Sequence, residues 1–414
     1  MARGPLTRPA PTRPPPTRPA PTRPPLRVLV VDHTAEPGGA ELALLRLCRE
    51  LVTTADDLEV RALLLSDGPL VDRLEAVGVP VDVLAVARDV VTASRYGLSG
   101  GGALRRLRGV ARTQVALWRA LRRADIDVVH TTSLKAHLLA TVPALAARRR
   151  VVWYAHDRVA PDYLPWPAVL LVRAVGRLPR AVIANSRATA ATLGRAAVVA
   201  YPGLDPDQAI APSLPVPPRA GAPVVGIVGR VSPTKGQLEL VRAAPRVLER
   251  HPGARFRVVG GPMFGAADHL ARVRAEAERL GVAERFAWPG TVPDTRAELD
   301  AMAVCVHASP VPEPFGQVVV EALARGVPVV ATDAGGVPEI VGRGPHALGA
   351  LVPPGDVAAL ADAIVAVLDD LPAAARRADR ARRVVAERFG VAGTARVVSA
   401  AWRDAARRGR RRRP

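Results

Sequence analysis

The alternation of short, Val-rich apolar runs with longer amphipathic stretches is the feature that most constrains the fold of this chain. Uninterrupted apolar runs are typical of strands buried on both faces of a parallel sheet. Ten runs are predicted as strands, in two series: Arg27–Val31, Val60–Leu65, Val128–His130, Val151–Ala155 and Ala181–Ala184, then Val224–Val228, Phe256–Val259, Arg285–Trp288, Val304–His307 and Val327–Ala331. Helical periodicity between them, as in Gly39–Val52, Gln237–Arg250 and Ala266–Leu280, predicts the order βαβα and the class α/β.

A proline-rich stretch separates the two series of strands. Residues 206–223 hold six prolines and no periodicity, which is typical of a linker. The 414 residues are enough for two domains of ordinary size. We therefore predict two Rossmann-like, doubly wound parallel-sheet domains that face each other across a cleft, over residues 26–205 and 223–390, joined by a linker at 206–222. A last helix over residues 391–408 has no obvious place in the second sheet.

Both ends of the chain are basic. The repeat Thr-Arg-Pro-x-Pro over residues 7–25 favours extended polyproline structure, so residues 1–25 are predicted to be a disordered arm and residues 409–414 a basic tail. Of the formal net charge of +20, 12 units come from residues 1–27 and 403–414. Because only 3% of the residues are aromatic, we expect no specific nucleic-acid partner. Attraction to an anionic membrane stays open.

The cysteines and the hydropathy predict a cytoplasmic protein. Cys48 and Cys305 are the only cysteines, and their isolation suits a reducing compartment. The N-terminus lacks the apolar core of a secretion signal, and no apolar run reaches the length of about 18 residues that a membrane span needs. The run Ala168–Val172, flanked by arginines, fits either a helix on the inner face of a membrane or a core helix that leads to a strand.

Polar and glycine residues follow seven of the predicted strands. These clusters are Asp32–Glu41, His156 with Asp157, Asn185 with Ser186, Gly229 with Arg230, Gly260–Pro262, Ser309–Glu313 and Asp333–Gly336. In open α/β sheets, ligands bind at the carboxyl ends of the strands. Clusters distributed over both sheets therefore predict one site shared between the two domains.

Two cations in the second half are candidates for binding a diphosphate. Arg230 ends a strand, and Lys235 precedes a helix five residues later. Such a pair can neutralise phosphate oxygens, although a surface arginine and lysine in a loop would give the same pattern. Since the chain has only two lysines, the use of one here favours a function.

Glu313 and Glu321 flank the predicted start of a helix near Gly316. The free amides of Phe315, Gly316 and Gln317 predict an anion site at that helix start. Two carboxylates beside it can accept hydrogen bonds from sugar hydroxyls. Glu321 lies between apolar neighbours, where an unpaired charge would be costly, and an ordinary exposed helix glutamate is the alternative.

Two features of the first half are weaker candidates. Gly38 and Gly39 lack the third glycine of a dinucleotide fingerprint, but a glycine pair lets the backbone approach a sugar or phosphate closely. A simple turn that opens a helix is the alternative. His156 at a strand end could contact a sugar hydroxyl or transfer a proton, or it could be a structural histidine bonded to a loop.

Metal binding is not expected. Two Asp-x-Asp pairs, Asp125 with Asp127 and Asp205 with Asp207, have the spacing that can bind a divalent ion. The first pair precedes a strand, at its wrong end for a ligand, and the second lies at the linker.

Together these motifs resemble those of the retaining glycosyltransferases of family four, which have the GT-B fold. The matching motifs, in the family's order, are Gly38–Glu41, His156 with Asp157, Asn185 with Ser186, Tyr201–Asp205, Gly229 with Arg230, Lys235 with Gly236, Glu313 with Glu321, and Asp333–Val341. Glu313 and Glu321 with the glycines that trail them are the most specific part. The resemblance implies a nucleotide-diphosphate sugar as donor, no metal, and a final helix that crosses back to the first domain.

The resemblance also implies roles for individual residues. Arg230 and Lys235 would hold the donor diphosphate, with Gly39 and its neighbour Gly38 approaching from the first domain and Gly261 from the second. Glu313 and the backbone of Phe315–Gln317 would hold the transferred sugar, Glu321 the ribose, and His156 the donor sugar near the reacting carbon. The first domain, with loops such as Asp89–Gly102, would bind the acceptor.

No catalytic nucleophile is evident opposite the donor, so we favour front-side attack in which the leaving diphosphate accepts the acceptor's proton. A double displacement through Glu313 is the alternative mechanism. Other functions to weigh are a nucleotide-sugar epimerase, a pyridoxal-dependent phosphorylase that would need Lys135 or Lys235, and a non-catalytic binding protein of the same fold.

Overall fold

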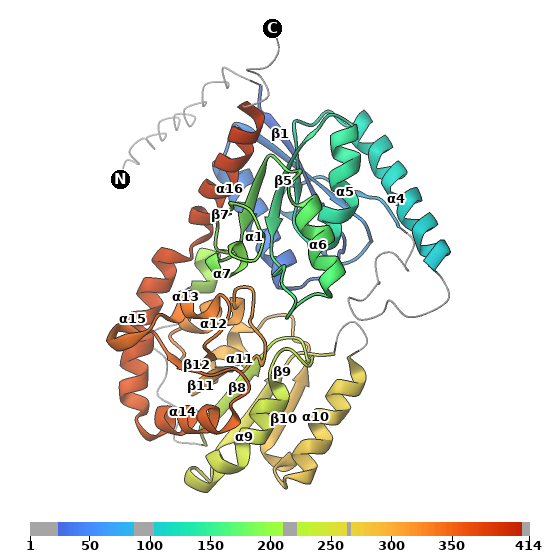
Figure 1. Ribbon diagram of the computed structural model, residues 1–414. Coiled ribbons are helices and arrows are strands. Elements are labelled where there is room, and N and C mark those ends of the chain that lie inside the picture. The colour runs from blue at the N-terminus through green and yellow to red at the C-terminus, as the bar shows by residue number, and fades with distance from the viewer. Residues whose placement is uncertain (1–23, 87–102, 210–221, 263–265, 408–414) are drawn as a thin grey trace, which may run out of the picture.

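The computed structural model describes residues 24–86, 103–209, 222–262 and 266–407 (Figure 1). Almost all of the predicted N-terminal arm, the basic tail, most of the predicted linker and the segment Asp89–Gly102 lie outside the described residues. The start of the predicted linker forms a short helix, α8 (Pro206–Ala209). Within the described part of the chain, no helix has both the length and the apolar character that crossing a bilayer requires.

The first domain is built on a seven-stranded sheet whose neighbouring strands are all parallel. From edge to edge its strands are β3 (Val81–Val83), β2 (Leu58–Leu64), β1 (Leu26–Asp32), β4 (Val128–Thr131), β5 (Arg150–Ala155), β6 (Ala181–Ala184) and β7 (Val198–Val199). Its helices are α1 (Gly39–Thr54), α2 (Leu70–Ala76), α4 (Ala103–Arg123), α5 (Leu134–Ala146), α6 (Trp166–Val175) and α7 (Arg187–Ala190). The strand order reverses between β1 and β4, which is where such sheets bind ligands.

The second domain repeats this plan with six parallel strands. From edge to edge they are β10 (Phe286–Gly290), β9 (Arg255–Val259), β8 (Val224–Val228), β11 (Val304–His307), β12 (Val329–Thr332) and β13 (Ala350–Val352). Its helices are α9 (Gln237–Arg250), α10 (Ala267–Arg279), α11 (Arg296–Asp300), α12 (Gln317–Ala324), α13 (Val337–Val341), α14 (Val357–Asp369) and α15 (Leu371–Arg388), with 3₁₀ turns at Ala283–Arg285 and Gly344–His346. Here the order reverses between β8 and β11.

The predicted fold class is confirmed: both sheets are parallel and helices alternate with strands. All ten predicted strands are present, and α9 begins and ends where it was predicted. β12 begins at Val329, two residues later than predicted, because Pro328 cannot donate to a ladder and its carbonyl instead accepts from Cys305 N. The short strands β3, β7 and β13 were not predicted.

The last helix, α16 (Val391–Arg407), leaves the second domain and packs against the first (Figure 1). Its residues Ala395, Val398, Trp402 and Ala405 belong to the same apolar cluster as strands β1, β2 and β4. Inside that cluster the Trp402 indole donates to His130 Nδ1 at 3.1 Å. The helix therefore ties the two domains together.

The chain passes between the domains at a tight backbone contact. The Leu204 amide donates to the Phe389 carbonyl at 2.8 Å, and the Val391 amide donates back to the Leu204 carbonyl at 3.0 Å. A side chain on Gly203 would lie 2.4 Å from Val391 Cα, so this crossing requires glycine.

Candidate active site

Residues from both domains meet at the carboxyl ends of the two sheets. Arg46 Nη1, on α1, lies 3.9 Å from Glu321 Oε1, on α12. The charge of Arg230, after β8, is close enough to lower the pKa of Glu41 on α1. Candidate residues of the two halves thus come together where the two domains meet.

Glu313 and Lys235 form the central contact of the second domain's half. Lys235 Nζ donates to both carboxylate oxygens of Glu313, each at 2.8 Å. His307 Nε2 lies 3.9 Å from Glu313 Oε2. Although burial disfavours the charge on Glu313, the Lys235 ammonium and the His307 ring hold the pKa of this carboxyl below its usual range. The sequence predicted that Lys235 and Glu313 belong to one site, but it did not predict that they are in direct contact.

Glycines hold the backbone of Glu313 in place. Gly336 N donates to the Glu313 carbonyl at 2.9 Å. Gly335 has φ +65°, and a Cβ there would lie 2.0 Å from the same oxygen. Only glycine combines this left-handed conformation with so close an approach. The glycines that trail Glu313 in the sequence are thus its support.

Arg230 is exposed. It follows Gly229, whose backbone is in close contact with another glycine, as Glu313 is with Gly335. Gly229 donates to the Val259 carbonyl at 2.9 Å, and a Cβ on Gly260 would lie 2.0 Å from the Gly229 carbonyl oxygen. The Arg230 carbonyl accepts from Gln237 Nε2 at 2.9 Å. Gly261 is equally confined, since a Cβ there would lie 2.6 Å from Thr291 Oγ1. The loop is thereby fixed with its arginine facing α1.

The start of α12 is formed by Gly316, which has φ +106°. The Phe315 side chain is buried and stacks on Tyr201 at 5.8 Å between ring centroids, so only the Phe315 backbone is available to a ligand. Gln317 is the first helical residue, and its side-chain amide lies near the Glu321 carboxyl. This leaves the Phe315–Gln317 backbone beside Glu313, as the sequence predicted.

Glu321 is not an ordinary exposed helix glutamate. Its side chain is 19% exposed, and burial raises the pKa of this carboxyl while the Arg46 charge opposes the shift. Arg46 was missed from the sequence. Its signal was a charged residue in an apolar register of α1, between Leu45 and Leu47, both of which are buried.

His156 follows β5 and packs against Tyr154, with 4.1 Å between ring centroids and an angle of 44° between the ring planes. Burial lowers the pKa of His156 to about 4, outweighing the nearby Asp157 and Asp32. The ring is therefore neutral at neutral pH and has an aromatic neighbour that the sequence did not reveal. Asn185 Nδ2 donates to the His156 carbonyl at 3.2 Å. This bond gives a structural role to the polar residue that follows β6.

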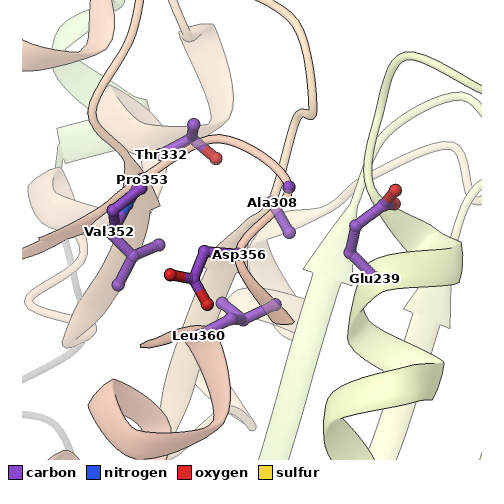
Figure 2. Close-up of a pocket in the computed structure, with 8 residues that line it drawn as sticks. Glu239, Ala308, Thr332, Val352, Pro353, Asp356 and Leu360 are labelled. Carbon is purple, nitrogen blue, oxygen red and sulfur yellow. The ribbon is translucent and has the colours of Figure 1, made fainter. Parts of the chain in front are cut away.

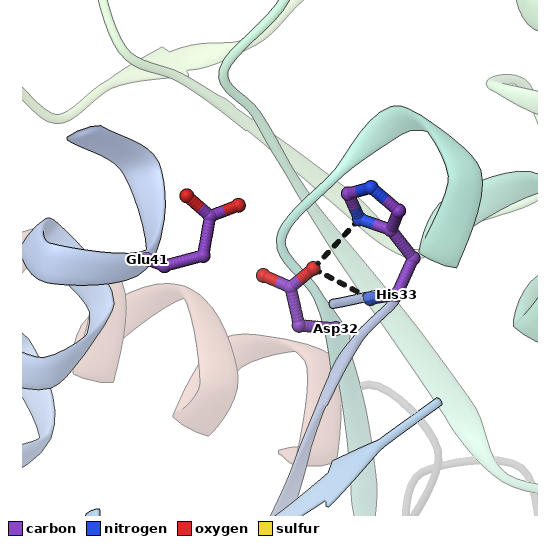
Figure 3. Close-up of side chains that lie close together, drawn as sticks. All are labelled: Asp32, His33 and Glu41. Carbon is purple, nitrogen blue, oxygen red and sulfur yellow. Dashed lines mark hydrogen bonds and ion pairs between the residues drawn. The ribbon is translucent and has the colours of Figure 1, made fainter. Parts of the chain in front are cut away.

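Asp32, His33 and Glu41 form a compact cluster beside the first-domain glycines (Figure 3). Asp32 is fully buried and accepts from Thr132 Oγ1 at 2.6 Å, and His33 Nδ1 lies 3.0 Å from Asp32 Oδ1. Burial and the Asp32 charge raise the pKa of Glu41 to about 8. The three side chains bring potential ligand atoms within 4.8 Å of one another, the chemistry a metal ion would need.

The glycine pair opens onto this cluster. Gly38 precedes α1, and a Cβ there would lie 2.5 Å from Glu41 Oε2. A Cβ on Gly39 would meet no atom within 4 Å. Gly39 therefore presents its backbone to open space, the arrangement that close approach of a ligand needs.

Both Asp-x-Asp pairs have structural partners. Arg27 donates to Asp125 and, at 3.4 Å, to Asp127. Asp205 accepts from Arg49 Nη1 at 2.8 Å.

A small hollow lies farther along the second sheet's carboxyl ends (Figure 2). Its volume is about 10 Å³, and its lining includes Glu239, Thr332 and Asp356. That volume holds one water at most, so this hollow is no sugar site.

A polar seam joins α7 of the first domain to the loop that carries Glu313. Ser186 Oγ and Thr189 Oγ1 donate to the Pro314 carbonyl at 2.5 and 3.2 Å. The Glu339 carboxylate accepts from the amides of Arg187 and Ala188 at 3.0 and 2.8 Å. Tyr201 OH also donates to Glu339, at 2.9 Å. The sequence singled out Ser186 and Glu339 without indicating that they join the domains.

Comparison with known proteins gives this geometry its chemical context. The model described as "Glycosyltransferase Family 4" matches residues 37–208, and that described as "Glycosyl transferases group 1" matches residues 222–370. The chain belongs to the family 4 glycosyltransferases. This confirms both the resemblance and the prediction that the protein is a glycosyltransferase.

Individual relatives agree with the family. The chain is 37% identical over 219 residues to a D-inositol 3-phosphate glycosyltransferase of Kribbella flavida, covering 50% of each protein. It is 35% identical over 199 residues to a 2-deoxystreptamine glucosyltransferase of Streptomyces kanamyceticus, covering 45% of this chain and 49% of that enzyme. The chain thus spans about half the length of these relatives.

A solved structure matches over a longer range. Anabaena HepE, in complex with UDP and glucose, superposes with a TM-score of 0.75 at 29% identity, covering 90% of this chain and 98% of HepE. The two-domain architecture of this glycosyltransferase is accordingly the GT-B fold.

Proposed function

We propose that this glycosyltransferase moves a sugar, with retention of configuration, from a nucleotide-diphosphate sugar to an acceptor hydroxyl on a glycan, a lipid or a small molecule. The contact of Lys235 with Glu313 is the observation that carries the proposal. It joins a cation suited to phosphate with a carboxylate suited to sugar hydroxyls, beside Arg230 and the start of α12. The likeness to HepE, solved with UDP and glucose, supports a UDP-sugar as the first donor to test.

Arg230 and Lys235 are proposed to bind the donor diphosphate. An ammonium has three N–H donors, and Lys235 directs its bonds at the two oxygens of Glu313, so it can also bridge to a phosphate. The open backbone at Gly39, with Gly38 before it, suits approach from the first domain. Gly261 lies beside the Arg230 loop, and its backbone suits close approach to the donor from the second domain.

Glu313 and the backbone of Phe315–Gln317 are proposed to hold the transferred sugar. Glu321 is proposed to accept from the ribose hydroxyls, with Arg46 orienting its carboxylate from the first domain. His156, kept neutral by burial, can donate or accept a hydrogen bond at the donor sugar near the reacting carbon.

The proposed transfer is a front-side displacement. The bond from the anomeric carbon to the diphosphate oxygen breaks as the acceptor oxygen bonds to the same face of that carbon. The acceptor's proton passes to the departing diphosphate oxygen. Arg230 and Lys235 stabilise the negative charge that develops there. Glu313 is committed to Lys235, which supports a binding role for it over a covalent one.

We further propose that the reaction needs no metal and takes place in the cytoplasm. Asp125, Asp127 and Asp205 have arginine partners, which supports the first point. Cys48 and Cys305 are both free and buried, which supports the second. Turnover that survives EDTA is the expected result for a metal-independent enzyme.

A donor screen tests the proposal. UDP-, GDP- and ADP-glucose are added to the full chain and the melting temperature is recorded, because a ligand that binds the native state raises it by mass action. We expect one nucleotide sugar to raise the melting temperature and to be consumed with an α-linked product. A response to none of them would contradict the proposal.

A further inference from the structure

An exposed apolar surface runs along α6 and the neighbouring end of α5. It comprises Val142, Leu145, Trp166, Leu170, Leu171 and Leu178. These are six of the ten large apolar side chains that are exposed within the described residues, and Trp166 is 69% exposed. A water-facing helix normally presents polar residues on this side, so a contiguous apolar set marks an interaction surface.

The opposite side of α6 is firmly packed. Val169 and Val172 are buried in the cluster that contains Trp153 and Leu193. Arg173 donates to the carbonyls of Val159 and Thr192, which fixes the helix to the loops beside it. The helix is thus apolar on both sides, and its exposed side is presented by a rigid element. For Ala168–Val172 the sequence left open a core helix or a helix on a membrane surface. Packing in the core accounts for only one face of α6.

The charge around this surface is one-sided. Residues 128–204 contain ten lysines and arginines and only two acids, Asp157 and Asp162. Arg177 and Arg180 are exposed at the end of α6, and Arg148 is exposed at the end of α5. The ion pairs found among the described residues include none for Arg148, Arg150, Arg177 or Arg180.

A basic hollow lies at one end of the apolar surface. Its volume is about 410 Å³, and it is lined by Leu145, Arg148, Arg149, Arg150, Leu178 and Arg180. Arg149 is committed to carbonyls at the end of α4, including that of Ala124 at 2.8 Å. The remaining arginines are available to phosphate oxygens beside two apolar side chains, the combination that a phospholipid headgroup and the start of its chains require.

We propose that this surface, the α6 patch (Val142, Leu145, Trp166, Leu170, Leu171 and Leu178 with Arg148, Arg150, Arg177 and Arg180), docks the protein on an anionic lipid bilayer. The apolar side chains enter the interface between headgroups and acyl chains, and the arginines bind lipid phosphates. A second copy of the chain is the less suitable occupant, because a symmetric contact would bring the same arginines together.

One end of the patch lies close in the chain to His156 of the candidate site. The loop between β5 and α6 begins with His156, and Tyr163 OH donates to Asp157 Oδ1 at 2.7 Å just before α6 starts. In Figure 1 the start of α6 points toward the second domain. The loop that carries His156 therefore lies next to one end of the patch.

Co-sedimentation with vesicles tests the α6 patch on the full chain. Vesicles of phosphatidylcholine alone are compared with vesicles that also contain phosphatidylglycerol. We expect the wild type to bind the anionic vesicles, and the double variant Leu170→Ser with Leu171→Ser to bind roughly tenfold more weakly. Val52→Ser is the matched control, since Val52 is an exposed residue of α1 (43%), and it should bind like the wild type.

A charge variant separates the patch from the basic ends of the chain. We expect Arg177→Gln with Arg180→Gln to weaken binding about tenfold. Arg376→Gln with Arg377→Gln removes the same charge from exposed positions of α15 and should leave binding within about twofold of wild type. Equal losses in both pairs would assign the binding to overall charge and overturn the proposal.

Trp166 provides a direct optical readout. Its emission should shift to shorter wavelength when anionic vesicles are added, and Trp166→Phe should lose that shift. The proposal is overturned if the wild type fails to bind, if the Leu170 and Leu171 variant binds as well as wild type, or if these substitutions instead convert a dimer to a monomer. Because the donor screen uses no lipid, failure here is distinguishable from failure of the proposed transfer.

Discussion

The two halves of the cleft carry charge in different ways. In the second domain, Lys235 pairs with Glu313, and the pKa of this carboxyl is held below its usual value, so Glu313 is charged near neutrality. In the first domain, burial raises the pKa of Glu41 to about 8 and lowers that of His156 to about 4. One half therefore presents a charged pair, and the other contains a carboxyl and an imidazole that are both uncharged near neutrality.

The backbones of the two halves also differ in how closely they are packed. Gly335 and Gly260 let segments of the second domain approach within distances that no side chain permits. Gly39 in the first domain faces open space instead. In the proposed site, the donor would bind mainly to the half that these close glycine contacts hold in place. The comparison predicts that losses in the second domain abolish turnover, whereas changes in the first domain alter its pH dependence.

The largest expected effect is that of Glu313→Gln. The substitution removes the charge that pairs with Lys235 and should lower kcat about a thousandfold, the scale typical of a lost electrostatic contact in an active site. Steady-state kinetics with the donor identified by the screen measures it. Glu284→Gln, an exposed glutamate of the same domain, is the control and should behave like wild type. A loss below tenfold would remove Glu313 from the site.

Glu41 should make a distinct contribution to the pH dependence of stability. Its native pKa of about 8 exceeds the value of 4.5 for an exposed glutamate, so between these pH values the native state retains a proton that the unfolded state has lost. The free energy of unfolding therefore falls as pH rises through that range. Urea unfolding at pH 5 and pH 8 measures the difference between the two proteins: on going to pH 8, wild type should lose up to about 4 kcal/mol relative to Glu41→Gln, because the buried histidines contribute equally to both. Equal pH dependence in both proteins would refute the assignment.

Arg46→Met tests the contact that joins the two halves. Without Arg46, the pKa of Glu321 should rise further, and the KM for the donor should increase about tenfold with kcat nearly unchanged, as expected for lost binding. Arg49→Met is the matched control, since Arg49 lies on the same helix but pairs with Asp205. If both variants raise KM equally, the effect belongs to α1 in general.

The smallest expected effect is that of Glu339→Gln in the polar seam. Glu339 accepts from two amides of α7 and from Tyr201 OH. Loss of its charge should reduce the free energy of unfolding by about 1–2 kcal/mol, in the range of hydrogen bonds to charged groups. Chemical unfolding measures this loss. Glu387→Gln, on the exposed side of α15, should show none.

The sequence predicted the interior of both sheets and the edge strand β10, but it missed the other three edge strands. Central strands such as β1 and β8 are continuous apolar runs because both faces are covered. The missed strands β3, β7 and β13 are all at sheet edges and have only two or three residues. A partly exposed edge strand of two or three residues needs no uninterrupted apolar run, so composition does not mark it.

The sequence named candidate site residues but did not indicate which of them are in contact. Glu313, Lys235 and Arg230 could be found because charged residues followed buried strands. The contacts of Lys235 with Glu313, and of Arg46 with Glu321, join residues 78 and 275 positions apart, and only the packed fold sets them. The same holds for the Glu339 seam, which joins α7 to residues about 150 positions away.

The most direct test of the account is calorimetric titration of wild type and Glu313→Gln with the nucleotide sugar selected by the screen and with its nucleoside diphosphate. The account predicts that both proteins bind the nucleoside diphosphate similarly through Arg230 and Lys235. It also predicts that only wild type gains affinity from the attached sugar. If Glu313→Gln binds the nucleotide sugar as tightly as wild type, Glu313 does not hold the sugar and the central claim is wrong.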